Sequence, residues 1–184
     1  LDEAGWAMNE STGIREKDGE PLNLLLTLES DYSATSMPTA EVIKSQLAEV
    51  GIDVTIYGTE QMQWYADYLE GKFDLTLWHS QFAFASPHCW FTPMDSMVPQ
   101  TPSLPGIEGS DEFLATIKNL TNMVDEQEVR NTYTYLFNFD VGTVLDIPLT
   151  YQKDMIVYNT DKISGYTFTG TPYFFDILSL EPAE

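Results

Sequence analysis

Short apolar runs alternate with amphipathic segments in the first third of the chain. Residues 22–28 form a nearly continuous apolar run, as expected of a strand buried on both faces. Residues 39–50 carry apolar side chains at helical spacing, with Thr39 as the expected cap and Gly51 as the stop. Residues 52–57 form a second strand, and a helix between two strands makes them parallel neighbours. The pattern therefore predicts a βαβ unit.

The same alternation of helix and strand continues after this unit. Residues 61–69 predict a helix that carries Met62, Tyr65 and Leu69 on its apolar stripe. Residues 73–78 then alternate large apolar and polar side chains, which predicts a third strand.

Two further helices and some short strands are predicted in the second half. The helices span 112–123 and 126–139, one or two strands lie within 144–158, and a last strand covers 175–180. No internal repeat or linker interrupts the chain. Together these elements predict one α/β domain over residues 1–184, with a mixed, mostly parallel sheet flanked by helices.

Composition and charge narrow the choice of partners. The chain has 8 Lys plus Arg against 29 Asp plus Glu, a formal net charge of -21. This charge repels phosphate backbones and anionic lipid headgroups, so we expect no nucleic-acid or membrane-surface binding. The single Cys89 excludes an internal disulfide and a cysteine-rich zinc site. Residues 1–6 read like the last turn of a helix ending at Gly5, so we expect a piece of a longer protein.

The candidate ligand-binding side chains lie in residues 80–105, which are rich in proline and aromatic residues and are predicted to be irregular. They follow the third predicted strand, and α/β sheets bind ligands beyond the carboxyl ends of their strands. The aromatic candidates are Phe82, Phe84, Trp90 and Phe91. Each ring has core or inter-lobe packing as an equal alternative. His88 has three readings, namely structural hydrogen bonding, ligand contact and, more remotely, metal ligation.

Signatures of enzymes are absent from the sequence. It holds no GxSxG, HExxH, GxxxxGK[ST], GxGxxG or CxxC motif, and we predict neither catalysis nor a cofactor. An acidic secreted hydrolase stays open as a remote alternative. Its carboxylate pair would come from Asp74, Asp95, Asp111, Asp140 and Asp146. A structural adhesion domain is a third reading, and it would keep the aromatic rings packed inside.

Five segments carry a resemblance to a known family. They read LDEAGW (1–6), IREKDGEPL (14–22), AEVIKSQLAEVGIDV (40–54), EGKFDLTLW (70–78) and SPHCWFTPM (86–94). In order and spacing they resemble the distal half of the extracytoplasmic solute-binding proteins of peptide and nickel ABC importers, with a leaning toward the nickel-type branch.

The resemblance implies one lobe of a type II periplasmic-binding-protein-like fold. The chain would be the C-terminal lobe of a two-lobe protein that closes on its ligand, without the N-terminal lobe. Its partners would be a small ligand, either a nickel chelate or a short peptide, and the permease of an ABC transporter. The place of action would be extracytoplasmic, with a lipid anchor as an option.

The resemblance also implies which residues face the ligand. Residues 80–84 would line the cleft, with Gln81 and Phe82 where nickel-type members place an aromatic residue and a glycine. Thr171 resembles a polar position that closes on the ligand. The metal-binding histidine that nickel-type members can carry has no counterpart in residues 97–103. The expected ligand-binding residues are Gln81, Phe82, Phe84, His88, Trp90 and Thr171, with His88 as a weak candidate for metal.

Overall fold

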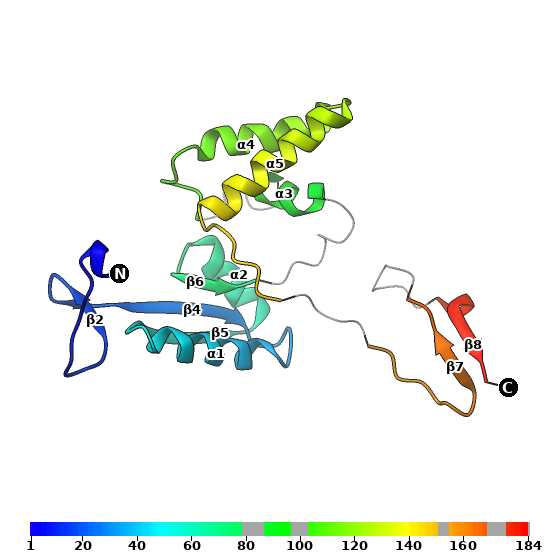
Figure 1. Cartoon of the computed structure of the whole chain (residues 1–184), viewed down its shortest axis with the longest axis horizontal. Helices are drawn as coiled ribbons and strands as arrows, with labels where there is room; N and C mark the ends of the chain where they lie inside the picture. The colour runs from blue at the N-terminus through cyan, green and yellow to red at the C-terminus, as the bar shows by residue number, and fades with distance from the viewer. Residues whose placement is uncertain (79–86, 97–102, 151–154, 169–175, 184) are drawn as a thin grey trace.

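The computed structural model describes residues 1–78, 87–96, 103–150, 155–168 and 176–183 (Figure 1). Its helices are α1 (Ser36–Ala48), α2 (Gln61–Leu69), α3 (Pro87–Ser96), α4 (Ser110–Asn119) and α5 (Glu126–Gly142). Its strands are β1 (Ala7–Met8), β2 (Arg15–Lys17), β3 (Glu20–Pro21), β4 (Asn23–Glu29), β5 (Asp53–Thr59), β6 (Leu75–Leu77), β7 (Ile163–Tyr166) and β8 (Leu180–Pro182). None of the helices in these ranges combines the length and apolarity that crossing a bilayer requires.

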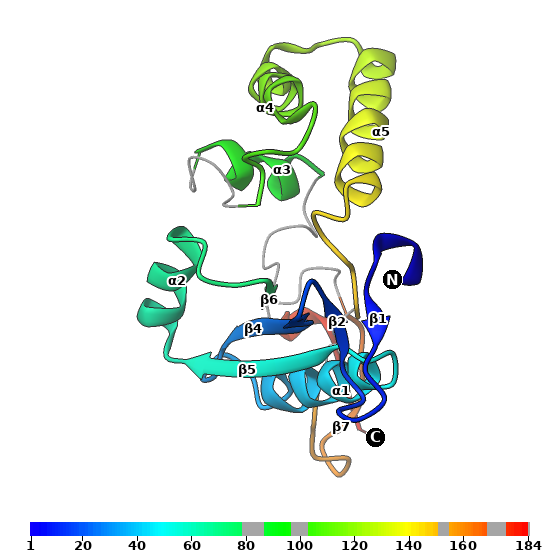
Figure 2. The same ribbon diagram turned by 90° about the vertical axis from the view of Figure 1, so that its left-hand side faces the viewer.

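The predicted βαβ unit is confirmed by a three-stranded parallel sheet. Its strand order is β5-β4-β6, so β4 is central and pairs in parallel with both neighbours. Leu26 and Leu28 of β4 point toward α1, where they form a core with Ala40 and Val54. Figure 2 shows α1 lying along this face of β4 and β5. Burial on this face explains the apolar run of β4.

The other face of the sheet carries polar contacts and is covered by α2. Because side chains alternate along a strand, Thr27 points away from α1, and its hydroxyl donates to Thr76 Oγ1 at 3.0 Å. Trp64 Nε1 of α2 donates to the same Thr76 Oγ1 at 3.1 Å. The two helices α1 and α2 thus lie on opposite faces, which confirms the predicted α/β class.

The predicted apolar stripe of α2 is wrong, although its bounds are confirmed. Met62 is 70% exposed and Leu69 is also exposed, whereas Trp64 and Tyr68 are buried. Apolar residues occur on both sides of this helix, so spacing alone could not identify the buried side. The Trp64 indole has an N–H that reaches Thr76, and its large ring buries more area than the flexible Met62.

The start of α1 also differs from the prediction. The helix begins at Ser36 after Thr35, so Thr39 lies inside it and caps nothing. Pro38 occupies the first turn, where backbone N–H groups have no partner within the helix and proline is tolerated.

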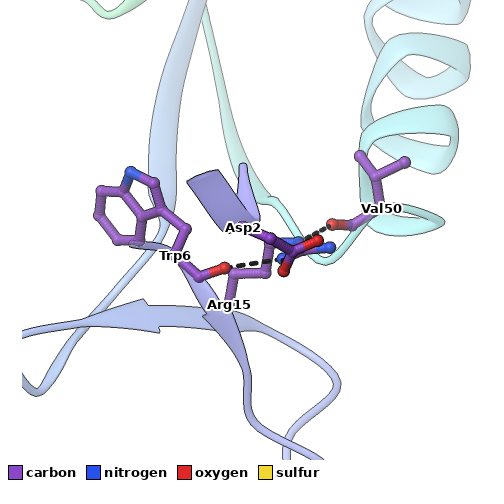
Figure 3. A network of polar contacts seen from close by, with 4 residues as sticks. All are labelled: Asp2, Trp6, Arg15 and Val50. Atoms are coloured by element: carbon purple, nitrogen blue, oxygen red, sulfur yellow. Dashed lines mark hydrogen bonds and ion pairs between the residues drawn. The ribbon is translucent and has the colours of Figure 1, made fainter. Parts of the chain in front are cut away.

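Arg15 ties the N-terminal segment to the end of α1. A short 3-10 turn at Asp2–Ala4 ends at Gly5 with φ 85, as predicted for the end of a helical turn. The Arg15 guanidinium donates from Nη1 to Asp2 Oδ1 at 2.6 Å and to the Trp6 carbonyl at 2.7 Å. Its Nε donates to the Val50 carbonyl at 2.8 Å (Figure 3). The hydrogen bond from Arg15 lowers the pKa of Asp2. This network attaches the antiparallel sheet β1-β2-β3 to the sheet module, which comprises α1, α2, β4, β5 and β6.

Helices α3, α4 and α5 form a second unit with its own core, the helical module (Figure 1). Phe91 of α3 packs edge-on against Phe113 of α4 at 6.0 Å, and Leu136 of α5 completes the centre. The prediction of two helices after residue 110 is confirmed. The prediction of an irregular stretch is wrong for residues 87–96, which form α3. Pro87 is the first residue of this helix, where its missing N–H has no cost, and Phe91 is held in the core.

The strands predicted within 144–158 are absent from the described residues 144–150 and 155–158. Ile147, Leu149, Met155 and Val157 alternate as in a strand, yet all are exposed. A strand needs a neighbour for its backbone hydrogen bonds, and the described residues supply none here. The strand predicted at 175–180 is mostly a 3-10 turn, Ile177–Ser179. It leads into β8, which pairs with β7 away from both modules (Figure 1).

Val144 ends α5 in a strained conformation, which gives a first testable prediction. Its φ is 57, and Leu145 N–H bonds the Asp140 carbonyl while Val144 N–H bonds the Val141 carbonyl. This is a Schellman end, whose left-handed position favours glycine over a β-branched residue. Replacing the exposed Val144 by glycine is expected to raise the free energy of unfolding by about 1 kcal/mol, measured by urea denaturation.

Val124 provides the matched control for this substitution. It is exposed, as Val144 is, but its φ is not positive. Val124→Gly should lower the free energy of unfolding by about 0.5–1 kcal/mol, because glycine only adds freedom to the unfolded chain there. Equal losses in both variants would show that Val144 carries no strain.

Candidate functional site

The carboxyl ends of three parallel strands meet at one edge of the sheet module. Glu29 ends β4 and pairs in register with Thr59, which ends β5. The pairing of β4 with β6 stops at Leu28 and Leu77, and one further step along each strand reaches Glu29 and Trp78. Ligands of open α/β sheets bind beyond such an edge. This edge is therefore the candidate ligand-binding site.

Aromatic rings gather on the face that α2 covers, and Trp78 among them lies at this edge. Trp78 lies 5.0 Å from Trp64 and 4.9 Å from Tyr68, measured between ring centroids. Phe73 stacks on Tyr68 at 5.5 Å with an interplanar angle of 6°. Trp78 is 46% exposed, so its ring is available to a ligand.

Tyr57 of β5 stands on the same face as Glu29. It pairs in register with Thr27, and Glu29 lies two residues farther along β4, so both point away from α1. The Tyr57 side chain is also 46% exposed. The face therefore presents a carboxylate between one accessible ring on β5 and another that follows β6.

Glu29, the last residue of β4, is the buried acid of this edge, and the residue is only 9% exposed. Burial, and secondarily the nearby charge of Asp31, raises the pKa of Glu29 above its usual value. Neither cause involves a cation. Removing a carboxylate from water without a partner costs free energy, and such groups concentrate at functional sites.

The predicted site residues are only partly described. Gln81, Phe82, Phe84 and Thr171 lie outside the described residues. His88 and Trp90 are half-buried on α3. Trp90 packs against the core of the helical module, and its Nε1 donates to Asp140 Oδ2 at 3.2 Å. The roles of these six residues in ligand binding therefore remain predictions.

Two carboxylates proposed for a hydrolase do come together. Asp140, near the end of α5, and Asp146 lie close enough to act on each other's ionisation, and Trp90 Nε1 donates to Asp140 Oδ2. Burial, followed by the charge of Asp140, raises the pKa of Asp146 to about 7, and burial also raises the pKa of Asp140. Hydrolytic carboxylates stand roughly 5–9.5 Å apart across an open cleft, whereas Asp140 is buried and Asp146 is half-buried. Burial and the raised pKa values of both carboxyls suit a structural pair that shares a proton.

Metal ligands do not gather in the described residues, where no group of three or more His, Cys, Asp or Glu side chains is assembled. A shallow hollow of about 490 Å³ lies between α4 and α5. Its wall includes Glu112, Asp125 and Glu128, with no cationic side chain. It lies on the helical module, apart from the edge of the parallel sheet.

Sequence reasoning placed the site after the third strand but missed Glu29. The signal was a charged residue at the end of an apolar run, followed within two residues by Asp31. Such an ending also fits a solvated turn. Only the pairing of β4 with strands on both sides shows that Glu29 is enclosed.

Comparison with known proteins places these features in a wider context. Residues 1–101 match the model of a family described as "Bacterial extracellular solute-binding proteins, family 5 Middle". The nickel-binding periplasmic protein of Escherichia coli (strain K12) is 32% identical over 94 residues, which are 51% of this chain and 18% of that protein. The oligopeptide-binding protein OppA of Lactococcus lactis subsp. lactis (strain IL1403) is 38% identical over 63 residues, which are 34% of this chain and 10% of OppA.

A solved structure agrees with these relatives. The crystal structure of NikA from Brucella suis in complex with Fe(III)-EDTA superposes with a TM-score of 0.67 at 30% identity. The match covers 76% of this chain and 28% of that chain. The chain thus spans less than a third of each of these proteins.

Proposed function

Because the chain belongs to family 5 of the bacterial extracellular solute-binding proteins, we propose that it is part of the solute receptor of an ABC importer. The receptor would capture a small ligand outside the cytoplasmic membrane and deliver it to the permease. The carboxyl edge of the parallel sheet carries this proposal, because it offers accessible rings and a buried carboxylate where α/β folds bind ligands. We propose no catalytic role.

The chain would form the C-terminal lobe of a larger, two-lobe protein. Support comes from the small share of its relatives that it spans and from its exposed apolar residues. Ile147, Leu149, Met155 and Val157 would pack against the N-terminal lobe. An exposed alternating apolar segment of this kind marks a surface that another part of the protein covers. The whole of residues 1–184 would then act as one body in the closure of the receptor on its ligand.

Nickel or a metal chelate is the proposed ligand. Support comes from the names of two similar proteins, one that binds nickel and one solved with Fe(III)-EDTA. A chelate brings its own ligands for the metal, so the receptor needs to recognise only its organic shell. A short peptide is the alternative, favoured by the similarity to OppA.

The deciding experiment is calorimetric titration of the full-length protein. Ni(II), a nickel–histidine chelate and a mixture of short peptides would be titrated separately, and repeated with His88→Ala. Binding of a nickel species alone is expected, and its loss in the variant would place His88 at the ligand. Cys89→Ala, which changes a half-buried neighbour on the same helix, is the matched control.

Other outcomes would redirect the proposal. Binding of peptides alone would assign the protein to the peptide-binding branch and leave His88 as part of the scaffold. Binding of none of the three would contradict the receptor function itself.

A further inference from the structure

Residues 144–150, the exit segment, turn back onto the helical module before they reach solvent. The left-handed conformation of Val144, with φ 57, reverses the chain, and Leu145 N–H then donates to the Asp140 carbonyl at 3.0 Å. The Leu145 side chain packs against the core of the helical module. Ile147, the next apolar residue, is 62% exposed. The exit segment is therefore fastened to this module over its first residues.

The Asp140 carboxylate is buried where the exit segment meets the helical module. Asp140 is 3% exposed, and its Oδ2 accepts the hydrogen bond from Trp90 Nε1 of α3 at 3.2 Å. Its Oδ1 is fully shielded from solvent and has no hydrogen-bond partner. A buried acceptor without a donor costs free energy. This oxygen therefore indicates a place where a donor is missing as long as the neighbouring carboxyl is ionised.

Asp146 of the exit segment can supply that donor. It is half-buried and lies close enough to Asp140 that each carboxyl acts on the ionisation of the other. Two ionised carboxylates only accept hydrogen bonds and repel each other, whereas a proton on one makes it a donor to the other. The unpartnered Oδ1 of Asp140 and the neighbouring carboxyl thus fit a single shared proton.

The described surroundings of the pair offer no cation in place of the proton. Within the described residues neither carboxyl takes part in an ion pair, and Trp90 is the one other group that acts on their ionisation. The other described titratable groups on α3, α4 and α5, among them His88, Glu112 and Lys118, do not act on the pair. A calcium ion would need roughly six to eight oxygen ligands. Across the described ranges no third acid, His or Cys side chain joins the two carboxyls.

We propose that Asp140 and Asp146 form a proton-operated clasp, which holds the exit segment on the helical module while they share a proton and releases it when both are ionised. Release separates two like charges and returns Asp146 to water. In a two-lobe receptor the exit segment would lead toward the N-terminal lobe, so the clasp would make the movement of the lobes depend on pH. That consequence alone rests on the proposed function.

The direction of the pH dependence follows from burial. Burial, followed by the charge of Asp140, raises the pKa of Asp146 from 3.8 to about 7 in the closed clasp. In the open clasp Asp146 regains water and its usual pKa. The closed form therefore keeps a proton that the open form loses above pH 3.8, and the clasp weakens as the pH rises toward about 7.

Hydrogen–deuterium exchange of the full-length protein tests the clasp without any ligand. The probe is the Leu145 amide, which bonds the Asp140 carbonyl. After correction for the intrinsic pH dependence of exchange, its protection is expected to fall by up to about ten-fold per pH unit between about pH 5 and pH 7. Asp146→Asn, which stays neutral, should keep its protection constant over this range. Asp161→Asn removes a charge from an exposed position and should behave like the wild type.

Dilute urea distinguishes release of the exit segment from unfolding of the whole protein. Local release exposes little surface, so exchange at Leu145 should not respond to low concentrations of urea. Amides that exchange through global unfolding should become faster under the same conditions. A rise at Leu145 that parallels these amides would overturn the proposal, because the segment would then leave only when the protein unfolds.

Two further outcomes would overturn the clasp. The first is protection at Leu145 that does not depend on pH in the wild type, or that depends on pH equally in Asp146→Asn. The second is recovery of protection above about pH 7 on addition of calcium, since a cation rather than a proton would then close the pair. Neither outcome bears on ligand binding, which the calorimetric titration tests separately.

Discussion

Replacing Trp64 with alanine is expected to lower the free energy of unfolding by about 3–5 kcal/mol. The Trp64 side chain is 7% exposed and packs against Tyr68 and Trp78. Its Nε1 also donates to Thr76 Oγ1, which accepts a second hydrogen bond from Thr27. Truncation would leave a cavity between α2 and the sheet. It would also remove the indole N–H that donates to the Thr76 hydroxyl. Urea denaturation followed by circular dichroism measures the change.

Met62→Ala is the control on the opposite side of the same helix. Since Met62 is largely exposed, the substitution should change the free energy of unfolding by no more than about 0.5 kcal/mol. A large loss for Met62→Ala with a small loss for Trp64→Ala would mean that α2 packs with the face predicted from its spacing. The comparison therefore tests which face of α2 covers the sheet, independently of ligand binding.

Asp146→Asn is expected to raise stability at pH 8 by about 2–4 kcal/mol and to flatten the pH dependence. In the folded chain the pKa of Asp146 is about 7 against a usual 3.8, because the carboxyl is buried beside Asp140. The folded state thus holds a proton that the unfolded state releases. This favours folding at low pH, and the advantage is lost as the pH rises from about 3.8 to about 7. Asparagine stays neutral, and its amide can donate to the unpartnered Asp140 Oδ1.

Urea denaturation at intervals between pH 5 and pH 8.5 tests this expectation. The difference between variant and wild type should grow with pH and level off above about pH 7, where the Asp146 carboxyl of the wild type is ionised. Asp161→Asn, at an exposed position, is the control and should show no such trend. A constant difference across the range would mean that Asp140 and Asp146 do not share a proton.

The elements of the sheet module were largely predictable because their signals are local. The apolar run of β4, the helical spacing of α1 and the stop at Gly51 lie within about thirty residues and agree with one another. The same holds for α4 and α5, whose predicted bounds differ from the observed ones by only a few residues. The family was also accessible from sequence, since its segments recur in a fixed order over residues 1–101.

The burial of side chains was harder to predict from sequence where one hydrophobic pattern fits two different structures. The helix α2 has apolar residues on both sides, and the neighbouring Thr76 decides which side is buried. The alternation in 144–158 predicted strands, but the described part of that segment finds no strand to pair with. In both cases the local pattern was present, but the structure depends on a contact with another segment, which the pattern does not show.

Sequence by itself determined the α/β class, the three strands β4, β5 and β6 with the parallel pairing of the first two, and the family. Only the tertiary structure decided that Glu29 is enclosed between β5 and the residue after β6, and that Asp146 meets Asp140. The physical reason is that secondary structure follows from hydrogen bonds and side-chain spacing within one segment. The burial and charge state of a carboxyl instead depend on groups that distant segments bring to it through space.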